Sequence, residues 1–333
     1  MRRSDVLRVW GRVLQGYRPF LSIEITKECP LHCPGCYAYS ADHLGPGSTL
    51  LQLSDSRGQD LVAGVVEAVR RTRPLHVSLV GGEPLVRYRE LCEILPLLDR
   101  MGVEVQLVTS AVRPIPAEWS SIRSLHLAVS IDGLAPEHDR RRAPATYDRI
   151  LKHIAGHRII VHCTVTRPML QRRGYLAEFC RLWSERPEVR KIWFSIYTPQ
   201  EDDRSAERLE PPDREVFLEE LSAVAREFAK VHLPWGVLRG FRHPPRSPEE
   251  CTFARLTTCL TADLNTTVTP CQFGGKPVCA ECGCLASAGM HALSGLKLGG
   301  VIPVSSILNA SIRFGASNAS GGHPWRPSST VAG

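Results

Sequence analysis

The sequence predicts an α/β fold with a parallel sheet, and three observations support this. Short runs rich in β-branched residues recur along the chain, at 21–26, 75–80, 103–109, 125–131, 159–165 and 191–197. Amphipathic stretches of helix length lie between them, near 54–71, 87–101, 145–156 and 171–185, with a weaker one at 116–122. Such alternation implies parallel strands joined by right-handed crossovers. Six such units are too few for a closed eight-stranded barrel, so we expect an open doubly wound sheet or a partial barrel.

The unusual loops of the chain all follow predicted strands. CPLHCPGC comes after the first strand, GGEP after the second, TSA after the third, SIDG after the fourth and YTP after the sixth. In both candidate folds the chemistry takes place at the carboxyl ends of the strands. The sequence therefore places its functional loops on one side of the sheet.

Length and composition indicate a globular protein with an appendage. The chain has 333 residues, 43% hydrophobic and 23% charged, and its net charge of +7 is not gathered into one long basic run. We therefore expect no nucleic-acid partner. The expected parts are an N-terminal helix at 1–18, a main domain at 19–235 that ends with a helix at 212–231, a cysteine-rich segment at 236–292 that opens with a proline-rich linker, and an extension at 293–333 whose composition is that of a disordered tail from about 314.

The first twenty residues contain neither a signal peptide nor a membrane span. Arg8 and Arg12 interrupt the apolar residues there. Leu7, Trp10 and Leu14 share one helical face, which favours a helix packed against the domain over one lying on a membrane surface. The expected location is the cytoplasm.

Twelve cysteines are many for a chain without an export signal, and in such a chain they indicate metal binding or catalysis more often than disulfides. Three isolated ones, Cys92, Cys163 and Cys180, fall in predicted helices or strands and are expected in the core. Cys29-x3-Cys33-x2-Cys36 can bind three irons of an iron–sulfur cube and leave the fourth open. Zinc is the rival metal, with His32 or His43 as a fourth ligand.

This motif and its context resemble the radical S-adenosylmethionine (SAM) superfamily. The signature Cx3Cx2C of that family follows the first strand of a partial (β/α)6 TIM-like barrel, and the resemblance covers roughly residues 20–200. It implies that Cys29, Cys33 and Cys36 bind a [4Fe–4S] cluster whose open iron chelates SAM. The GGEP stretch resembles the family motif that holds the methionine amino group, which implies SAM contacts from Gly81, Gly82, Glu83 and Pro84.

Further SAM contacts follow from the same resemblance. Ser130 and Asp132 belong to an SIDG loop like that of the family, and Arg141 lies in a stretch whose arginine can meet the SAM carboxylate or the substrate. Thr109 and Ser110 would lie near the ribose, and Tyr37 near the adenine, although Gly35 stands where many members carry an aromatic residue. The alternative for the four Ser, Thr and Asp residues is capping of strand ends.

Six cysteines lie between 251 and 284, and their arrangement resembles the SPASM/twitch extensions that hold auxiliary [4Fe–4S] clusters. The match is partial, because Thr266 replaces the usual glycine and no cysteine follows Cys284. We expect one auxiliary cluster and two short strands around an Asp263–Asn265 turn. The expected ligands are Cys259, Cys271, Cys279 and Cys282, with Cys251 and Cys284 in reserve, and a zinc knuckle is the alternative.

The resemblance implies an enzyme, a radical SAM oxidoreductase or transferase. Reductive cleavage of SAM would give a 5′-deoxyadenosyl radical, which abstracts hydrogen from a substrate or adds to it. The substrate is a peptide or protein side chain, or a small metabolite or lipid, and the electrons come from a donor such as flavodoxin or ferredoxin. The alternative function is a non-catalytic iron–sulfur or zinc protein that carries electrons or acts as a scaffold.

Overall fold

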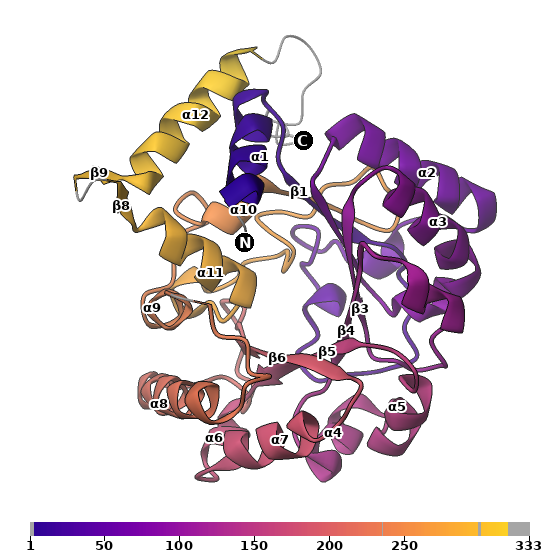
Figure 1. Ribbon diagram of the computed structural model, residues 1–333, viewed down its shortest axis with the longest axis vertical. Helices are drawn as coiled ribbons and strands as arrows, with labels where there is room; N and C mark the ends of the chain where they lie inside the picture. Colours follow the sequence, from indigo (N-terminus) through magenta and orange to yellow (C-terminus); the bar gives the residue numbers. More distant parts are fainter. Residues whose placement is uncertain (1–2, 235, 299–300, 319–333) are drawn as a thin grey trace.

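A seven-stranded, fully parallel sheet forms the centre of the molecule in the computed structural model, which describes residues 3–234, 236–298 and 301–318 (Figure 1). The strand order is β6-β5-β4-β3-β2-β1-β7, so the first six strands follow one another in sequence order. Their bounds are β1 Phe20–Glu24, β2 His76–Val80, β3 Glu104–Thr109, β4 Leu125–Ser130, β5 Ile159–Val165 and β6 Val189–Ile196. The seventh strand is β7, Thr257–Leu260, beside β1. The predicted α/β fold with a partial barrel is confirmed.

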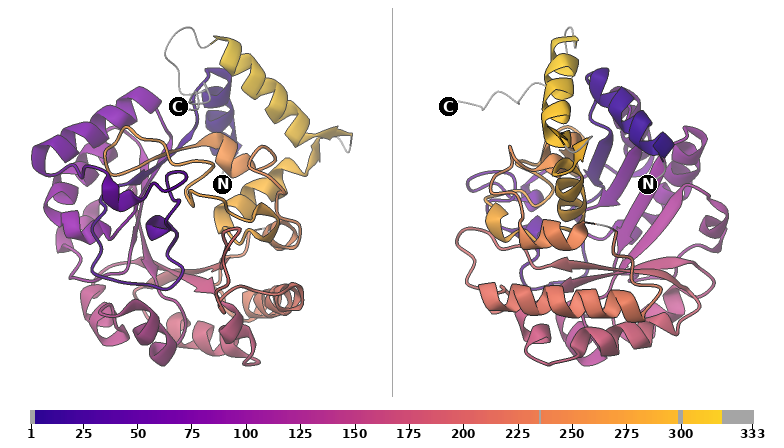
Figure 2. Two further views of the ribbon diagram at one scale, coloured as in Figure 1. Left: turned by 180° about the vertical axis from the view of Figure 1, so that it is seen from behind. Right: turned by 60° about the vertical axis from the view of Figure 1, so that its left-hand side comes forward.

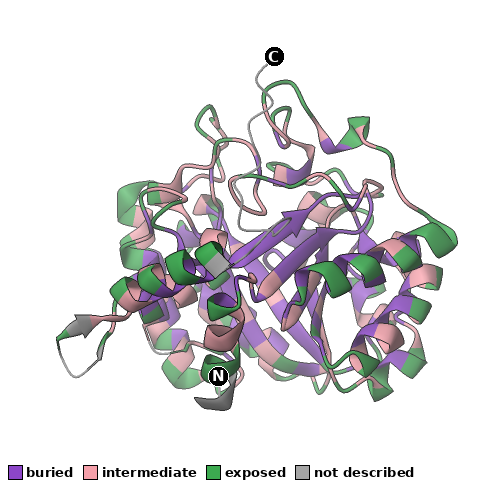
Figure 3. Cartoon of the chain, turned by 90° about the horizontal axis from the view of Figure 1, so that it is seen from above, coloured by how far each residue is buried: buried purple, intermediate pink, exposed green. Residues whose placement is uncertain are grey.

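The helices that follow the strands cover the outer face of the sheet (Figures 1 and 2). They are α2 Gly58–Thr72, α3 Tyr88–Arg100, α4 Ala135–Arg142, α5 Tyr147–His153, α6 Arg167–Leu170, α7 Tyr175–Ser184 and α8 Pro211–Glu227. The weak helical pattern at 116–122 is a 3-10 helix, η4 Ala117–Ser121. The helices are exposed outside and buried toward the strands (Figure 3).

Strand periodicity separates the core from the inner cavity of the half-barrel. Ile23 of β1 is buried in the main core, whereas Ser22 before it lines the cavity. β2 repeats this pattern, with Val77 in the core and Ser78 in the cavity. Successive side chains of a strand point to opposite faces, so the polar alternates of several strands face a common interior.

The predicted hairpin at 259–271 differs from the observed structure. β7 pairs in parallel with β1, and the returning segment forms one antiparallel bridge, Leu260↔Thr267. The predicted turn is present, because Asp263 accepts hydrogen bonds from the backbone amides of Asn265 (2.9 Å) and Thr266 (2.8 Å). Pro270 has no amide hydrogen to donate to a longer ladder.

The prolines of residues 236–252 led to the prediction of a linker, and this prediction is wrong. It contains α9, Val237–Arg242, whose Val237 and Phe241 belong to the main core. α9 packs against α11, Leu285–Ser294, where a Cβ on Gly240 would collide with the backbone of Ala288. The cysteine-rich segment is therefore fixed to the domain at its first helix.

The remaining elements lie at the two ends of the chain. α1, Arg3–Leu14, packs against α12, Val304–Asn318, with Val13, Leu308 and Ile312 buried between them (Figure 2). The other elements are the short helices η1 Tyr37–Tyr39, η2 Leu50–Gln52, η3 Pro84–Arg87, α10 Thr252–Leu256 and η5 Cys279–Glu281, and the strands β8 Lys297–Leu298 and β9 Ile302–Pro303. The expected tail begins later than 314, since α12 extends to Asn318; 319–333 lie outside the described residues.

Among the helices that the structure describes, none has the length and the apolar character that crossing a bilayer requires.

Candidate active site

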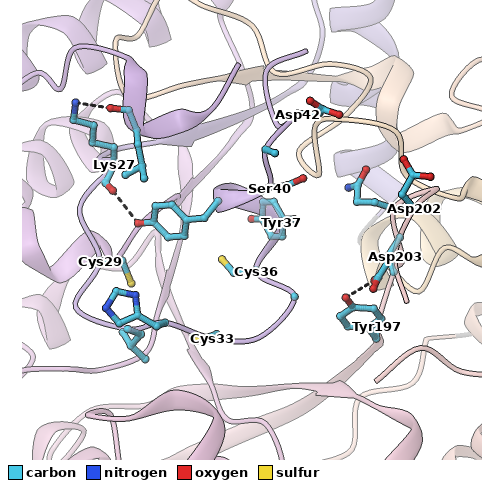
Figure 4. A pocket seen from close by; sticks show the side chains of 18 of the residues that line it. Lys27, Cys29, Cys33, Cys36, Tyr37, Ser40, Asp42, Tyr197, Asp202 and Asp203 are labelled. Carbon is cyan, nitrogen blue, oxygen red and sulfur yellow. Dashed lines mark hydrogen bonds between the residues drawn. The ribbon is translucent and has the colours of Figure 1, made fainter. Parts of the chain in front are cut away.

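The Cx3Cx2C loop forms a wall between two cavities at the carboxyl ends of the strands. The inner cavity, about 530 Å³, lies within the half-barrel, and the outer one, about 1160 Å³, opens toward the residues that follow β6. Cys29, Cys33 and Cys36 line both cavities, and Figure 4 shows them on one side of the outer cavity, with Asp42, Asp202 and Asp203 across from them. A group bound by these three cysteines would therefore be accessible from both cavities.

Glycine at position 35 is explained by its neighbour Tyr197. Gly35 has φ +62°, and a Cβ there would lie 2.7 Å from Cε2 of the Tyr197 ring. Tyr197 comes from the segment after β6 and donates a 2.5 Å hydrogen bond to Asp203. Residue 35 is not aromatic, and the space beside it is filled by the ring of Tyr197, which comes from a distant part of the chain.

The three thiols fit a cluster that carries positive charge. Burial raises the pKa of the Cys29 thiol to about 12 and also raises that of Cys36. Since the thiolate is the metal ligand, the binding of iron would provide the compensating charge. Within the described residues no group of three or more His, Cys, Asp and Glu side chains is arranged to hold a metal ion. The three cysteines line the two cavities, and cysteine thiolates are the usual ligands of iron–sulfur clusters.

Of the two histidines that the zinc alternative offers as a fourth ligand, His32 and His43, the second is held by other protein groups. Its side chain is fully buried, with Nε2 2.7 Å from the Glu24 carboxylate and Nδ1 3.2 Å from the carbonyl oxygen of Phe273. Both ring nitrogens are therefore occupied by protein groups. Sequence reasoning missed the Glu24–His43 pair, because its members belong to different segments that only the fold brings together.

The GGEP loop requires its glycines. Gly81 and Gly82 have φ of +79° and +38°, and a Cβ on Gly82 would lie 2.7 Å from the carbonyl oxygen of Thr26. Glu83, only 1% exposed, accepts hydrogen bonds from the amides of Leu85 (3.0 Å) and Ser110 (2.7 Å). Burial raises the pKa of this carboxyl. Pro84 begins the helix η3.

Thr109 and Ser110 at the end of β3 connect this loop to the rest of the site. The Thr109 hydroxyl donates to Glu83, and its oxygen accepts from the amide of Ala111 at 2.9 Å. Both residues line the inner cavity, as does Ser130 at the end of β4. Thr109 therefore caps the end of its strand, which was the alternative role considered for it, and it also faces the cavity.

Asp132 is a fully buried carboxylate held between two arginines. One of its oxygens accepts from Arg141 Nη1 (2.8 Å) and Arg142 Nε (2.6 Å), and the other from the Thr164 amide (3.0 Å). Burial alone would raise the pKa of Asp132, but the two guanidiniums hold it well below its usual range. Asp132 thus stays ionised and fixes the two arginines.

Arg141 and Arg142 have different neighbours. Arg141 makes a bidentate pair with Glu207 (2.8 and 2.7 Å) and also donates to the carbonyl of Pro34 (3.2 Å). Arg142 donates to the Ser110 hydroxyl (2.9 Å), and its charge lies within electrostatic range of Cys33 and Cys36. Both line the inner cavity. The run of three arginines could not reveal this difference, because neighbouring helical positions point about 100° apart.

The cysteines of the C-terminal segment surround a third, small cavity. Its cysteine lining consists of Cys251, Cys271, Cys279, Cys282 and Cys284. Cys259 is not among them: it lies in β7, in register with Ser22 of β1. Phe253, Phe273 and Cys284 line both this cavity and the inner cavity, so the two spaces share a wall. The remaining cysteines are as expected: Cys163 and Cys180 are fully buried, and Cys92 packs against the core.

Comparison with known proteins identifies the domain. Residues 23–171 match the model of the radical SAM superfamily. A 7-carboxy-7-deazaguanine synthase of Hyperthermus butylicus is 31% identical over 102 residues, which is 31% of this chain and 39% of that protein. The chain thus spans about two fifths of the length of this curated relative.

Two solved structures share the fold at low identity. SuiB of Streptococcus suis bound to precursor peptide SuiA has a TM-score of 0.57 and 14% identity, over 85% of this chain and 67% of that chain. Native anSMEcpe with bound AdoMet has a TM-score of 0.55 and 15% identity, over 76% and 74%. The family match and the motifs agree on one part of the chain. Residues 23–171 form a domain of the radical SAM superfamily, and a cysteine-rich segment follows it.

Proposed function

We propose that the chain is an enzyme that cleaves SAM at a [4Fe–4S] cluster bound by Cys29, Cys33 and Cys36. The observation that carries this proposal is the position of the three thiols, which line both the inner and the outer cavity. When bound, the cluster and SAM supply the chemistry: reductive cleavage yields methionine and a 5′-deoxyadenosyl radical, which abstracts hydrogen from the substrate or adds to it. The protein binds, orients and shields the reacting groups.

Arg142 is the residue that we assign to the SAM carboxylate. Its guanidinium faces the cysteine loop, and Asp132 and Ser110 fix its direction. Arg141, which the sequence suggested for this contact, donates its hydrogen bonds to Glu207, Asp132 and the carbonyl of Pro34. We therefore assign it the role of fixing the cysteine loop to α4.

Glu83 and the glycines before it would hold the amino group of SAM. Each carboxylate oxygen has two lone pairs, so Glu83 can accept a further donor beside those from Leu85, Thr109 and Ser110. Tyr37 and Tyr197 are two of the aromatic residues that line the outer cavity beside the cysteine loop, and we assign them to the adenine side of the site.

The substrate that we propose is a peptide or protein side chain. The outer cavity is open to solvent and, at about 1160 Å³, large enough for an extended segment. Solved relatives of the same fold are described as bound to a precursor peptide and to a Cp18Cys peptide, which supports this choice over a small metabolite or lipid. An electron donor such as flavodoxin or ferredoxin would supply the reducing electron.

An auxiliary [4Fe–4S] cluster in the cysteine-rich segment completes the proposal. The support is the cavity lined by five cysteines. The competing function, a non-catalytic iron–sulfur or zinc protein, would not account for three thiols that line two cavities at the ends of the strands.

Electron paramagnetic resonance of the anaerobically reconstituted, dithionite-reduced protein tests the first site. Addition of SAM is expected to change the g values of the reduced cluster, because a ligand binds its open iron. The change should be absent in Cys33→Ala. An unchanged spectrum, or zinc in place of iron and sulfide, would favour the competing function.

A further inference from the structure

His162 lines the inner cavity from the middle of β5, and none of the proposed SAM contacts uses it. It is in register with Ser130 at the end of β4 and with Trp193 of β6, and both of these residues line the same cavity. Two residues further along β5, the amide of Thr164 binds the Asp132 carboxylate. His162 lies within electrostatic range of that carboxylate, so it is next to the groups that orient the arginines of the site.

The two ring nitrogens of His162 have different surroundings. Nε2 lies 2.8 Å from the hydroxyl oxygen of Ser195, and this oxygen accepts a hydrogen bond from the amide of Leu285 at 3.3 Å. Within the described part of the chain, Nε2 is the acceptor for the Ser195 hydroxyl proton, and Nδ1 has no hydrogen-bond partner. Burial lowers the pKa of His162, so the ring is neutral and carries its single proton on Nδ1.

Nδ1 of His162 is open to the inner cavity. It is not among the buried side-chain atoms that lack a partner, although the residue lines this cavity and is partly buried. The ring is held from behind by Ser195, which is itself held by the amide of Leu285 at the start of α11. The fold therefore presents one fixed N–H donor to whatever enters the cavity.

The inner cavity offers little charge to a bound group. Among the described residues, Glu83, Arg141 and Arg142 are the charged ones that line it, and the proposed function uses all three for SAM and the cysteine loop. His76 also lines it and is kept neutral, because burial lowers its pKa to about 4. A charged side chain would lose its hydration here without gaining a counter-charge, which is strongly unfavourable.

The outer cavity has the opposite character. Charged side chains of both signs line it, and Figure 4 shows several of them: Lys27, Glu28, Asp42, Asp202, Asp203 and Lys276. Charged residues of a peptide can therefore find partners and water in the outer cavity. The inner cavity instead favours a neutral polar side chain, which loses less on leaving water.

We propose that His162 binds the reacting side chain of the peptide through its Nδ1–H group, and that this side chain is uncharged and carries an acceptor oxygen. Serine, threonine, asparagine and glutamine meet both requirements. The inference rests on the peptide substrate of the proposed function and names the class of side chain that enters the inner cavity. Ser195 is the positioning residue that fixes the direction of the ring.

Nitrogen NMR of the reconstituted, oxidised protein with isotope-labelled histidine tests the tautomer. The His162 resonances, identified by their loss in His162→Asn, are expected to show a neutral ring protonated on Nδ1 at neutral pH. A proton on Nε2 instead, or a cationic ring, overturns the inference, because the cavity would then receive either no donor or a charge.

Pools of short synthetic peptides, with random residues around one fixed central residue, test the substrate class. The readout is the release of 5′-deoxyadenosine above the rate without peptide. At least one pool with central serine, threonine, asparagine or glutamine is expected to stimulate release, and pools with central lysine, arginine, aspartate or glutamate are not. Stimulation by a charged pool, or by no neutral polar pool, overturns the inference.

Variants of His162 link the stimulation to this residue. His162→Leu should lower it by about 5- to 100-fold, the loss expected when a buried acceptor has no donor. His162→Asn keeps an amide donor near the place of Nδ1 and should retain more. The control is His126→Gln, whose ring pairs with Glu104 at 3.0 Å outside the cavity lining and which should behave like the parent.

Far-ultraviolet circular dichroism and the SAM-induced change of the g values show that each variant keeps its fold and its SAM site. Parental stimulation in His162→Leu overturns the inference. If His162→Leu does not fold, the tautomer and the peptide pools decide, since both are measured on the parent protein. A parent protein whose spectrum SAM leaves unchanged would refute the proposed function itself, a different failure.

Discussion

At the scale of one residue, the contacts of Asp132 explain why the SIDG motif contains an aspartate. Its buried carboxylate holds the side chains of Arg141 and Arg142 and accepts the Thr164 amide. The SIDG pattern singled out Asp132 as a contact of SAM or substrate, and the structure gives it these protein partners. Sequence alone could not show this, because the two arginines and Thr164 lie in other segments.

Replacement Asp132→Asn should destabilise the protein by about 3–5 kcal/mol, since it leaves a buried guanidinium without its counter-charge. Urea unfolding measures the effect. Glu215→Gln, which breaks the exposed pair with Arg242, is the control and should cost less than about 1 kcal/mol. Because the pKa of Asp132 is lowered in the folded state, its stabilisation is present above the unfolded pKa of about 3.9 and is lost only as the pH falls through the lower folded value. Equal costs for the two variants would contradict the buried pair.

Arg142→Gln should weaken SAM binding by about 10- to 100-fold, the loss expected for one charge-assisted hydrogen bond. Equilibrium dialysis of SAM against the reconstituted protein measures it. Arg140→Gln removes an exposed arginine from the same helix and should leave the dissociation constant unchanged. If both variants bound SAM like the parent, the assignment of Arg142 would be wrong.

At the scale of elements, the strands could be predicted and two later elements could not. The first six strands are apolar runs of five to eight residues, separated by amphipathic stretches of helix length, which is a strong local signal. β7 is only Thr257–Leu260 and lies among cysteines that dominate the pattern. α9 is followed by Pro244, Pro245 and Pro248, which led to the linker interpretation, although Phe241 is fully buried.

The buried position of α9 can be tested with one aromatic residue. Phe241→Ala removes a side chain that is 0% exposed and packs edge-on against Phe217, so it should cost about 3–5 kcal/mol of unfolding free energy. The matched control is Phe314→Ala in α12, where the ring is 57% exposed and the cost should stay within about 0.5 kcal/mol. A small cost at Phe241 would mean that the segment is a linker after all.

At the scale of the whole molecule, the half-barrel brings together groups that lie far apart in sequence. Cys33, Glu83, Ser110, Arg142 and Tyr197 all line one cavity, because parallel strands end at the same edge. Motif order and strand spacing were enough to predict that convergence. They could not predict which arginine faces the thiols, which ring fills the space at Gly35 or which cysteines share a cavity, because these depend on side-chain direction and tertiary packing.

The most direct test of the account is the release of 5′-deoxyadenosine by anaerobically reconstituted protein given SAM and dithionite. We expect the product to form in the parent protein and to disappear in Cys33→Ala, while the iron of the C-terminal segment stays bound. Release that persists in Cys33→Ala, or none from a parent protein that contains zinc without sulfide, would contradict the assignment of the Cx3Cx2C loop as the site of SAM cleavage.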